Sequence, residues 1–127
     1  MPIDELRAIL KERIMVLDGA VGTMIQAYDL EEGDFRGDRF SGHSSDLKGN
    51  NDLLTLTRPK IIEEIHRGFL EAGCDIVETN TFNSNAISQA DYSLEALVYE
   101  LNFEAVKIAK GLCAEYTRKN PGKPRFV

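Results

Sequence analysis

The sequence predicts an α/β fold built on parallel strands. Short apolar runs end abruptly at polar residues, longer segments carry apolar residues at helical spacing, and the two kinds of segment alternate along the chain. The chain has 127 residues, of which 43% are hydrophobic, enough to form the core of one domain. No internal repeat or low-complexity tract interrupts the pattern.

The first two elements are expected to be a helix and a strand. Residues 3–12 place apolar residues at helical spacing, which predicts a short amphipathic helix. Residues 14–17 form a continuous apolar run that stops at Asp18 and a glycine. Such a run is typical of a strand buried on both faces of a parallel sheet. A brief helix is predicted at residues 20–27.

No periodicity persists between residues 28 and 58, where glycines and polar residues dominate. A polar stretch of about thirty residues inside a compact domain is usually functional or disordered. Large apolar residues would anchor this stretch to a core, so we expect an ordered excursion beside an active site. These anchors are Phe35, Phe40, Leu47, Leu53 and Leu54.

Regular spacing returns at Pro59, which suits the first turn of a helix, and Gly73 is expected to end that helix. Residues 74–79 are predicted to form a second strand, and residues 80–85 a polar turn.

A long helix is predicted to follow, with Ser93 as its N-cap and a break at Asn120. Its apolar stripe is formed by Leu94, Leu97, Val98, Leu101, Ala105, Ile108, Leu112 and Tyr116. Residues 125–127 have the composition of the opening of a third strand. Because the sequence stops inside an element, we expect it to be a fragment of a larger domain.

Charge and hydropathy exclude several classes of function. The net charge of -6 argues against a nucleic-acid binder, and no apolar run approaches the length that spans a membrane. The N-terminus lacks the apolar region of a signal peptide, so a cytoplasmic protein is expected.

Neither the cysteines nor the histidines have the spacing of a metal site. Cys74 and Cys113 are far apart in the sequence and are expected to be reduced thiols. His66 falls within the predicted helix that begins at Pro59 and has no second ligand at helical spacing, and His43 does not complete a set with it. We therefore expect His66 to lie on the surface or in helix packing.

The first candidate site follows the first predicted strand. In parallel α/β folds, ligand-binding groups come from the C-terminal ends of strands and the loops after them. There Gly19 and Ala20 would bring backbone N–H groups close to a ligand, and Asp18 could hold an ammonium group. The alternative is that Asp18 only caps the short helix, and the composition does not decide between the two.

A second cluster follows the second predicted strand. Its members are Glu78, Thr79, Asn80, Thr81 and Phe82. Alone they would be an ordinary turn; beside the Asp18 turn they could bind a zwitterionic amino acid. A dinucleotide fingerprint fits poorly, because the glycine spacing is GxxG and no second strand follows promptly.

An ordered series of motifs resembles the start of the homocysteine-binding domain of cobalamin-dependent methionine synthases. The matching segments are residues 14–26, 34–37, 47–54, 72–84 and 89–92. The family fold is an eight-stranded (β/α) barrel of roughly 250 residues. The resemblance therefore implies that residues 1–127 are a partial homocysteine-binding domain, with an N-terminal helix at 1–13 and the first two to three barrel strands, with their helices, in 14–127.

The resemblance also implies a reaction. Family members transfer a methyl group from methylcobalamin, recharged by 5-methyltetrahydrofolate, to zinc-bound homocysteine, giving methionine; zinc lowers the pKa of the thiol. By resemblance, Asp18 and the backbone at residues 19–20 would orient the amino acid, and residues 78–82 would line the same pocket. No residue is assigned a catalytic role.

The family holds zinc through cysteines near later strands, which have no counterpart here. No metal ligand is assigned, and no cofactor is expected to bind this chain alone. Partners are expected to be homocysteine and the folate and cobalamin domains of a parent protein. We expect the isolated chain to be inactive and to self-associate through unpaired sheet edges.

Two alternatives stay open. Betaine- or S-methylmethionine-dependent homocysteine methyltransferases share the Asp-Gly turn, the helix end at residues 66–73 and the Thr-x-Thr-Phe pattern. Residues 35–37 and 48–52 resemble the cobalamin-dependent kind instead. The other alternative is a non-catalytic binding or assembly module that reuses the start of the barrel.

Overall fold

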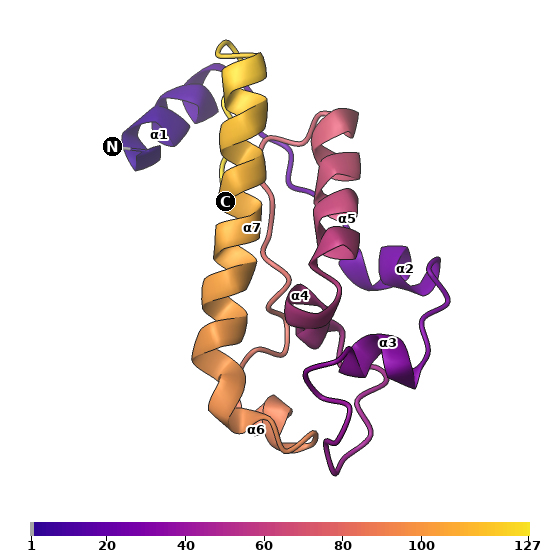
Figure 1. The fold of residues 1–127 in the computed structure, drawn as a ribbon. Helices are drawn as coiled ribbons and strands as arrows, with labels where there is room; N and C mark the ends of the chain where they lie inside the picture. Colours follow the sequence, from indigo (N-terminus) through magenta and orange to yellow (C-terminus); the bar gives the residue numbers. More distant parts are fainter. Residues whose placement is uncertain (1) are drawn as a thin grey trace.

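The structure, a computed structural model, describes residues 2–127 and consists of helices and a short array of extended chain (Figure 1). The helical segments are α1 (Pro2–Glu12), α2 (Val21–Gln26), α3 (Glu32–Arg36), η1 (Asn51–Leu53), α4 (Leu54–Thr57), α5 (Pro59–Ala72), α6 (Ala86–Ala90), η2 (Glu95–Leu97) and α7 (Val98–Lys119). None of the helices in the described part of the chain is long and apolar enough to cross a membrane.

The three predicted strands are extended segments joined by single parallel bridges. Leu17 pairs with Ile76, and Ile76 pairs with Phe126. The Asp18 N–H donates to the Ile76 carbonyl at 2.9 Å, and the Val77 N–H donates to the Phe126 carbonyl at 2.9 Å. Within residues 2–127 no longer strand ladder forms. The spatial order of the segments nevertheless follows their sequence order, and their parallel direction brings their C-terminal ends to one side.

The prediction that residues 14–17 are buried on both faces is wrong. Ile14 is 87% exposed, Val16 56% and Leu17 55%. The segment pairs along one edge only, with the chain around Ile76. Burial on both faces requires further layers of structure, and residues 2–127 do not supply them.

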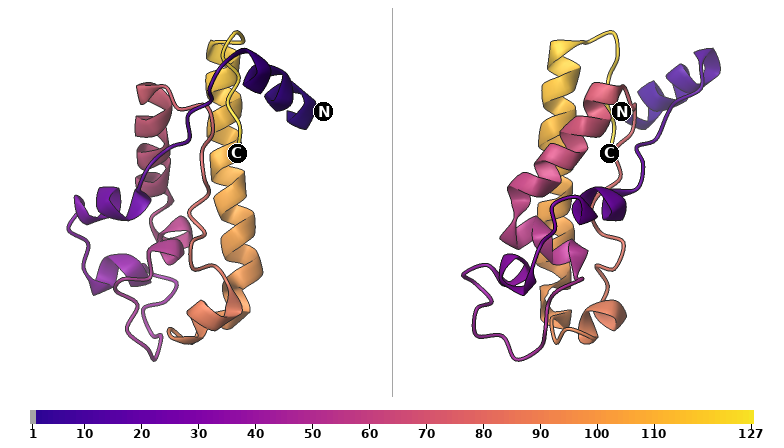
Figure 2. Two further views of the ribbon diagram at one scale, coloured as in Figure 1. Left: turned by 180° about the vertical axis from the view of Figure 1, so that it is seen from behind. Right: turned by 90° about the vertical axis from the view of Figure 1, so that its right-hand side faces the viewer.

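Helices α5 and α7 pack side by side, as all three ribbon views show (Figures 1 and 2), and both contribute residues to the two clusters of the core. One core cluster is formed by Ile25, Phe35, Phe40, Leu47, Leu53, Leu54, Ile62, Ile65, Leu94 and Leu101. A second is formed by Leu70, Cys74, Val77, Ala109, Leu112, Cys113 and Tyr116. The first cluster contains all five predicted anchors of the 28–58 excursion, so that segment is ordered, as predicted.

Polar contacts close the excursion on itself. The Arg36 guanidinium donates to the carbonyl of His43 at 2.7 Å and to that of Ser45 at 3.0 Å. The Glu32 carboxylate accepts from the backbone N–H groups of Leu47 and Lys48, both at 2.6 Å. These bonds satisfy backbone groups that a long loop would otherwise leave unpaired.

The predicted limits of α5 are confirmed. Pro59 stands in its first turn, and Gly73 ends it in the left-handed conformation, with φ of 105°. The predicted N-cap of the long helix is wrong. Ser93 has φ of 55° and lies in a turn, and α7 begins only at Val98, after the short segments α6 and η2. Leu94 lies before the start of α7 but is still buried, so the predicted apolar stripe includes a residue that packs into the core from outside the helix.

Helix α1 extends away from the rest of the molecule and has no buried residue (Figures 1 and 2). The chain that leaves it is tied to the second extended segment by Arg13. Its guanidinium donates to both carboxylate oxygens of Asp75, at 2.9 and 2.7 Å, and the Val16 N–H donates to the same carboxylate at 2.9 Å. This pair sets the register that places the end of the first segment beside the second.

Candidate functional site

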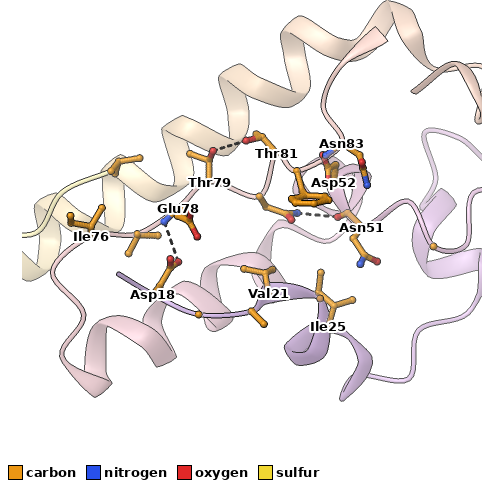
Figure 3. A pocket seen from close by; sticks show the side chains of 18 residues that line it. Asp18, Val21, Ile25, Asn51, Asp52, Ile76, Glu78, Thr79, Thr81 and Asn83 are labelled. Atoms are coloured by element: carbon orange, nitrogen blue, oxygen red, sulfur yellow. Dashed lines mark hydrogen bonds between the residues drawn. The ribbon is translucent and has the colours of Figure 1, made fainter. Parts of the chain in front are cut away.

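A cavity of about 920 Å³ opens where the first two extended segments end (Figure 3). All eight residues that the sequence suggested for the site line it: Asp18, Gly19, Ala20, Glu78, Thr79, Asn80, Thr81 and Phe82. Figure 3 shows Asp18, Val21 and Ile25 on one side of the cavity and Glu78, Thr79 and Thr81 on the other. The structure thus brings together two clusters about sixty residues apart in the sequence.

Asp18 joins the two sides of the cavity. Its Oδ2 accepts a hydrogen bond from the Glu78 N–H at 3.1 Å, and its Oδ1 is buried without a partner among the described residues. The N-cap of α2 is Ala20, with no side-chain cap bond, so Asp18 does not cap that helix. Burial raises the pKa of the Asp18 carboxyl, although the bond from the Glu78 N–H lowers it in part.

The members of the second cluster differ in exposure. The Thr79 and Thr81 hydroxyls lie 2.7 Å apart and are half-buried. Asn80 is buried and turned away from the solvent, donating to the Asn51 carbonyl at 3.0 Å and to the Thr55 hydroxyl at 3.3 Å. Phe82 is 94% exposed. Asn80 therefore supports the turn, while the threonines and Phe82 are free to meet a ligand.

Sequence reasoning missed a third part of the cavity wall. Gly49, Asn51 and Asp52, all from the 28–58 excursion, also line the cavity. The sequence did point to this region, because residues 47–54 are one of the segments that carry the family resemblance. Their contact with residues 80–84 is tertiary, and local spacing does not reveal it.

The cavity is acidic. Its charged lining residues are Asp18, Asp52 and Glu78, and none of its described lining residues is a lysine or arginine. Burial raises the pKa of Asp52 as well, against the lowering effect of its hydrogen bonds from Ser84 and Asn83. A ligand with a positive group on the side of Asp18 would restore favourable electrostatics there.

The described residues do not fit a zinc site. Residues 2–127 contain no group of three His, Cys, Asp or Glu side chains able to hold a metal ion. Cys74 and Cys113 are both buried free thiols, and burial raises the pKa of Cys113 to about 11. His66 is fully buried in α5, with neither ring nitrogen bonded to a described residue, and burial lowers its pKa. No chemical step is therefore derived through a metal.

Comparison with known proteins gives two findings. The homocysteine S-methyltransferase family model matches residues 15–127. Among solved structures, the metallated form of the homocysteine methyltransferase MmuM from Escherichia coli is similar, with a TM-score of 0.71 and 22% sequence identity. The match covers 96% of this chain and 38% of that protein, so the chain spans well under half of its length.

Proposed function

This chain belongs to the homocysteine S-methyltransferase family, and on that premise we propose that its acidic cavity is the amino-acid half of a homocysteine pocket. The observation that carries the proposal is the Asp18 carboxylate. Asp18 lines the cavity; one of its oxygens accepts from the Glu78 N–H, and the other is buried with no partner among the described residues. A buried acceptor of this kind is matched by a charged donor such as the α-ammonium group of an amino acid.

The rest of the cavity suits the remaining polar groups of an amino acid. Gly19 and Ala20 are exposed at its rim, where their N–H groups can donate to a carboxylate. The Thr79–Thr81 hydroxyl pair offers both donors and acceptors on the facing wall. These groups bind and orient the amino acid.

We assign the methyl transfer to a longer protein of which this chain supplies one part. The match covers 38% of the E. coli enzyme, and the described residues offer no metal site. The proposed reaction transfers a methyl group from methylcobalamin, recharged by 5-methyltetrahydrofolate, to homocysteine. Residues 35–37 and 48–52 support the cobalamin-dependent type over betaine- or S-methylmethionine-dependent enzymes, and residues 51 and 52 line the cavity.

Equilibrium binding of L-homocysteine to the chain and to D18N tests the binding proposal. A hydrogen bond between charged groups contributes about 1.5–3 kcal/mol, so D18N should weaken binding by roughly 10- to 100-fold. The matched control is D38N, which neutralises an exposed aspartate outside the cavity and should leave the affinity unchanged. Equal affinities for wild type and D18N would contradict the proposal.

A donor assay on the complete enzyme tests the proposed type of reaction. Methionine should form when methylcobalamin is the donor and not with betaine or S-methylmethionine. Formation with betaine or S-methylmethionine instead would assign the protein to the other types. Homocysteine binding without methionine from any donor would favour the non-catalytic module. The 127-residue chain alone should form no methionine.

A further inference from the structure

The cavity wall that carries Thr79 and Thr81 is a turn with little structure of its own. Within it the Thr81 N–H donates to the Thr79 carbonyl at 2.8 Å, and the Ser84 N–H donates to the Thr81 carbonyl at 3.2 Å. Neither bond belongs to a helix or a strand ladder. The shape of this wall must therefore be set by groups outside the turn.

Asp52 supplies two of those outside contacts. Its Oδ2 accepts from the Asn83 N–H at 2.8 Å and from the Ser84 hydroxyl at 2.6 Å. The residue is only 3% exposed, and the described residues give it no ion pair. Burying a carboxylate without a cation costs free energy, so an aspartate at this position lowers the stability of the fold unless the residue also has another role.

Buried amides reinforce the same connection. The Gln89 amide donates to the Asn83 carbonyl at 3.0 Å and exchanges two hydrogen bonds with the Asn50 amide, at 2.8 and 3.2 Å. The Asn80 amide donates to the Asn51 carbonyl at 3.0 Å. The turn is thus held at both ends by the segment that contains Asp52.

We propose that Asp52 is a positioning residue: by holding the Asn83 N–H and the Ser84 hydroxyl, it orients the turn so that the Thr79 and Thr81 hydroxyls face the amino-acid pocket. In Figure 3, Asp52 and Asn83 lie together at the Thr81 end of the cavity, away from Asp18. Asp52 acts through the turn, while Asp18 meets the ligand. This inference rests on the proposed function and adds a role for the 47–54 segment in ligand recognition.

Three substitutions in the full chain separate positioning from other roles: D52A, D52N and S84A. D52A removes both bonds and should weaken L-homocysteine binding by about 10-fold. D52N can place its amide oxygen where Oδ2 accepts from both the Asn83 N–H and the Ser84 hydroxyl, so it should recover most of the affinity. S84A removes one bond and should have an effect between wild type and D52A. D38N is the control for loss of an aspartate charge.

Two results would overturn the proposal. If D52A lowers the melting temperature but binds L-homocysteine like wild type below that temperature, Asp52 is only structural. If D52N binds as weakly as D52A, the charge of Asp52 acts on the ligand directly. Either result leaves the role of Asp18 untouched.

A ligand-free measurement separates this proposal from the proposed function. In ¹⁵N–¹H spectra, D52A should shift the amide resonances of Thr79, Thr81 and Asn83 and speed the hydrogen exchange of the Asn83 amide. Unchanged resonances and exchange would overturn the positioning role. Failure of wild type to bind L-homocysteine would instead count against the pocket assignment.

Discussion

Neutralising Asp75 should loosen the register on which the cavity depends. Asp75 is 1% exposed and accepts two hydrogen bonds from Arg13 and one from the Val16 N–H. The side-chain hydrogen bond from Arg13 is the main cause that lowers the pKa of Asp75, from 3.8 to about 2. The pair joins the first extended segment to the second just before the residues that line the cavity.

The lowered pKa of Asp75 gives the size of its contribution to the free energy of unfolding. Lowering the pKa from 3.8 to about 2 corresponds to about 2–3 kcal/mol, at about 1.4 kcal/mol for each pKa unit. The Arg13 side chain is 41% exposed, so solvent screening reduces this to about 1–2 kcal/mol. Because the folded pKa is the lower one, the unfolded chain binds more protons between about pH 4 and pH 2. The contribution is therefore complete above about pH 4 and is lost as the pH falls through about 2.

Urea denaturation of wild type and D75N across pH 2–7 measures this contribution. D75N should be less stable by about 1–2 kcal/mol at pH 7, and the difference should vanish near pH 2. The double variant R13A/D75N should lose less than the sum of the two single changes, because the residues act as a pair. A difference between wild type and D75N that is the same at pH 2 and pH 7 would refute the reasoning.

The remaining predictions concern two glycines and the buried thiols. G73A should destabilise the chain by about 1 kcal/mol or more, because φ of 105° is unfavourable for alanine and its Cβ would lie 3.2 Å from Lys123 Nζ. The control is G111A, at an exposed position in the middle of α7, where no heavy atom lies within 4 Å of the added Cβ; it should instead raise stability by about 0.5–1 kcal/mol. Thermal denaturation measures both changes. A stabilising G73A would contradict the left-handed conformation of Gly73. Cys113 is 4% exposed, and burial raises its pKa to about 11, so it should react with a thiol reagent only as fast as the chain unfolds; rapid labelling of the native chain would contradict its burial.

The long helices could be predicted from the spacing of apolar residues, because one side of each helix packs into the core and its residues recur at helical intervals. The limits of α5 follow from Pro59 and Gly73, whose backbone preferences act locally. The end of α7 near Asn120 was also predictable. By contrast, α6 was not predicted, because five residues are too few for a periodic apolar pattern, although the Asn85 side chain caps the helix by accepting from the Ser88 N–H.

The two predicted clusters of the candidate site could be placed together from the sequence, because the C-terminal ends of parallel strands lie on the same side of the fold. This topology brings Asp18 and Thr81 to one cavity, although the exposure of residues 14–17 shows that burial depends on neighbours that a local apolar run cannot specify. Asp52 was missed because a contact with Ser84, 32 residues away, leaves no periodic signal.

Titration of the ¹⁵N-labelled chain with L-homocysteine tests the central claim most directly. The claim is that the turn at residues 18–22 and the turn at residues 78–83 bind a single amino acid. The amide resonances of both turns should shift together, with one dissociation constant, and D18N should weaken both responses equally. Shifts confined to one turn, or centred on the exposed face of α7, would contradict it.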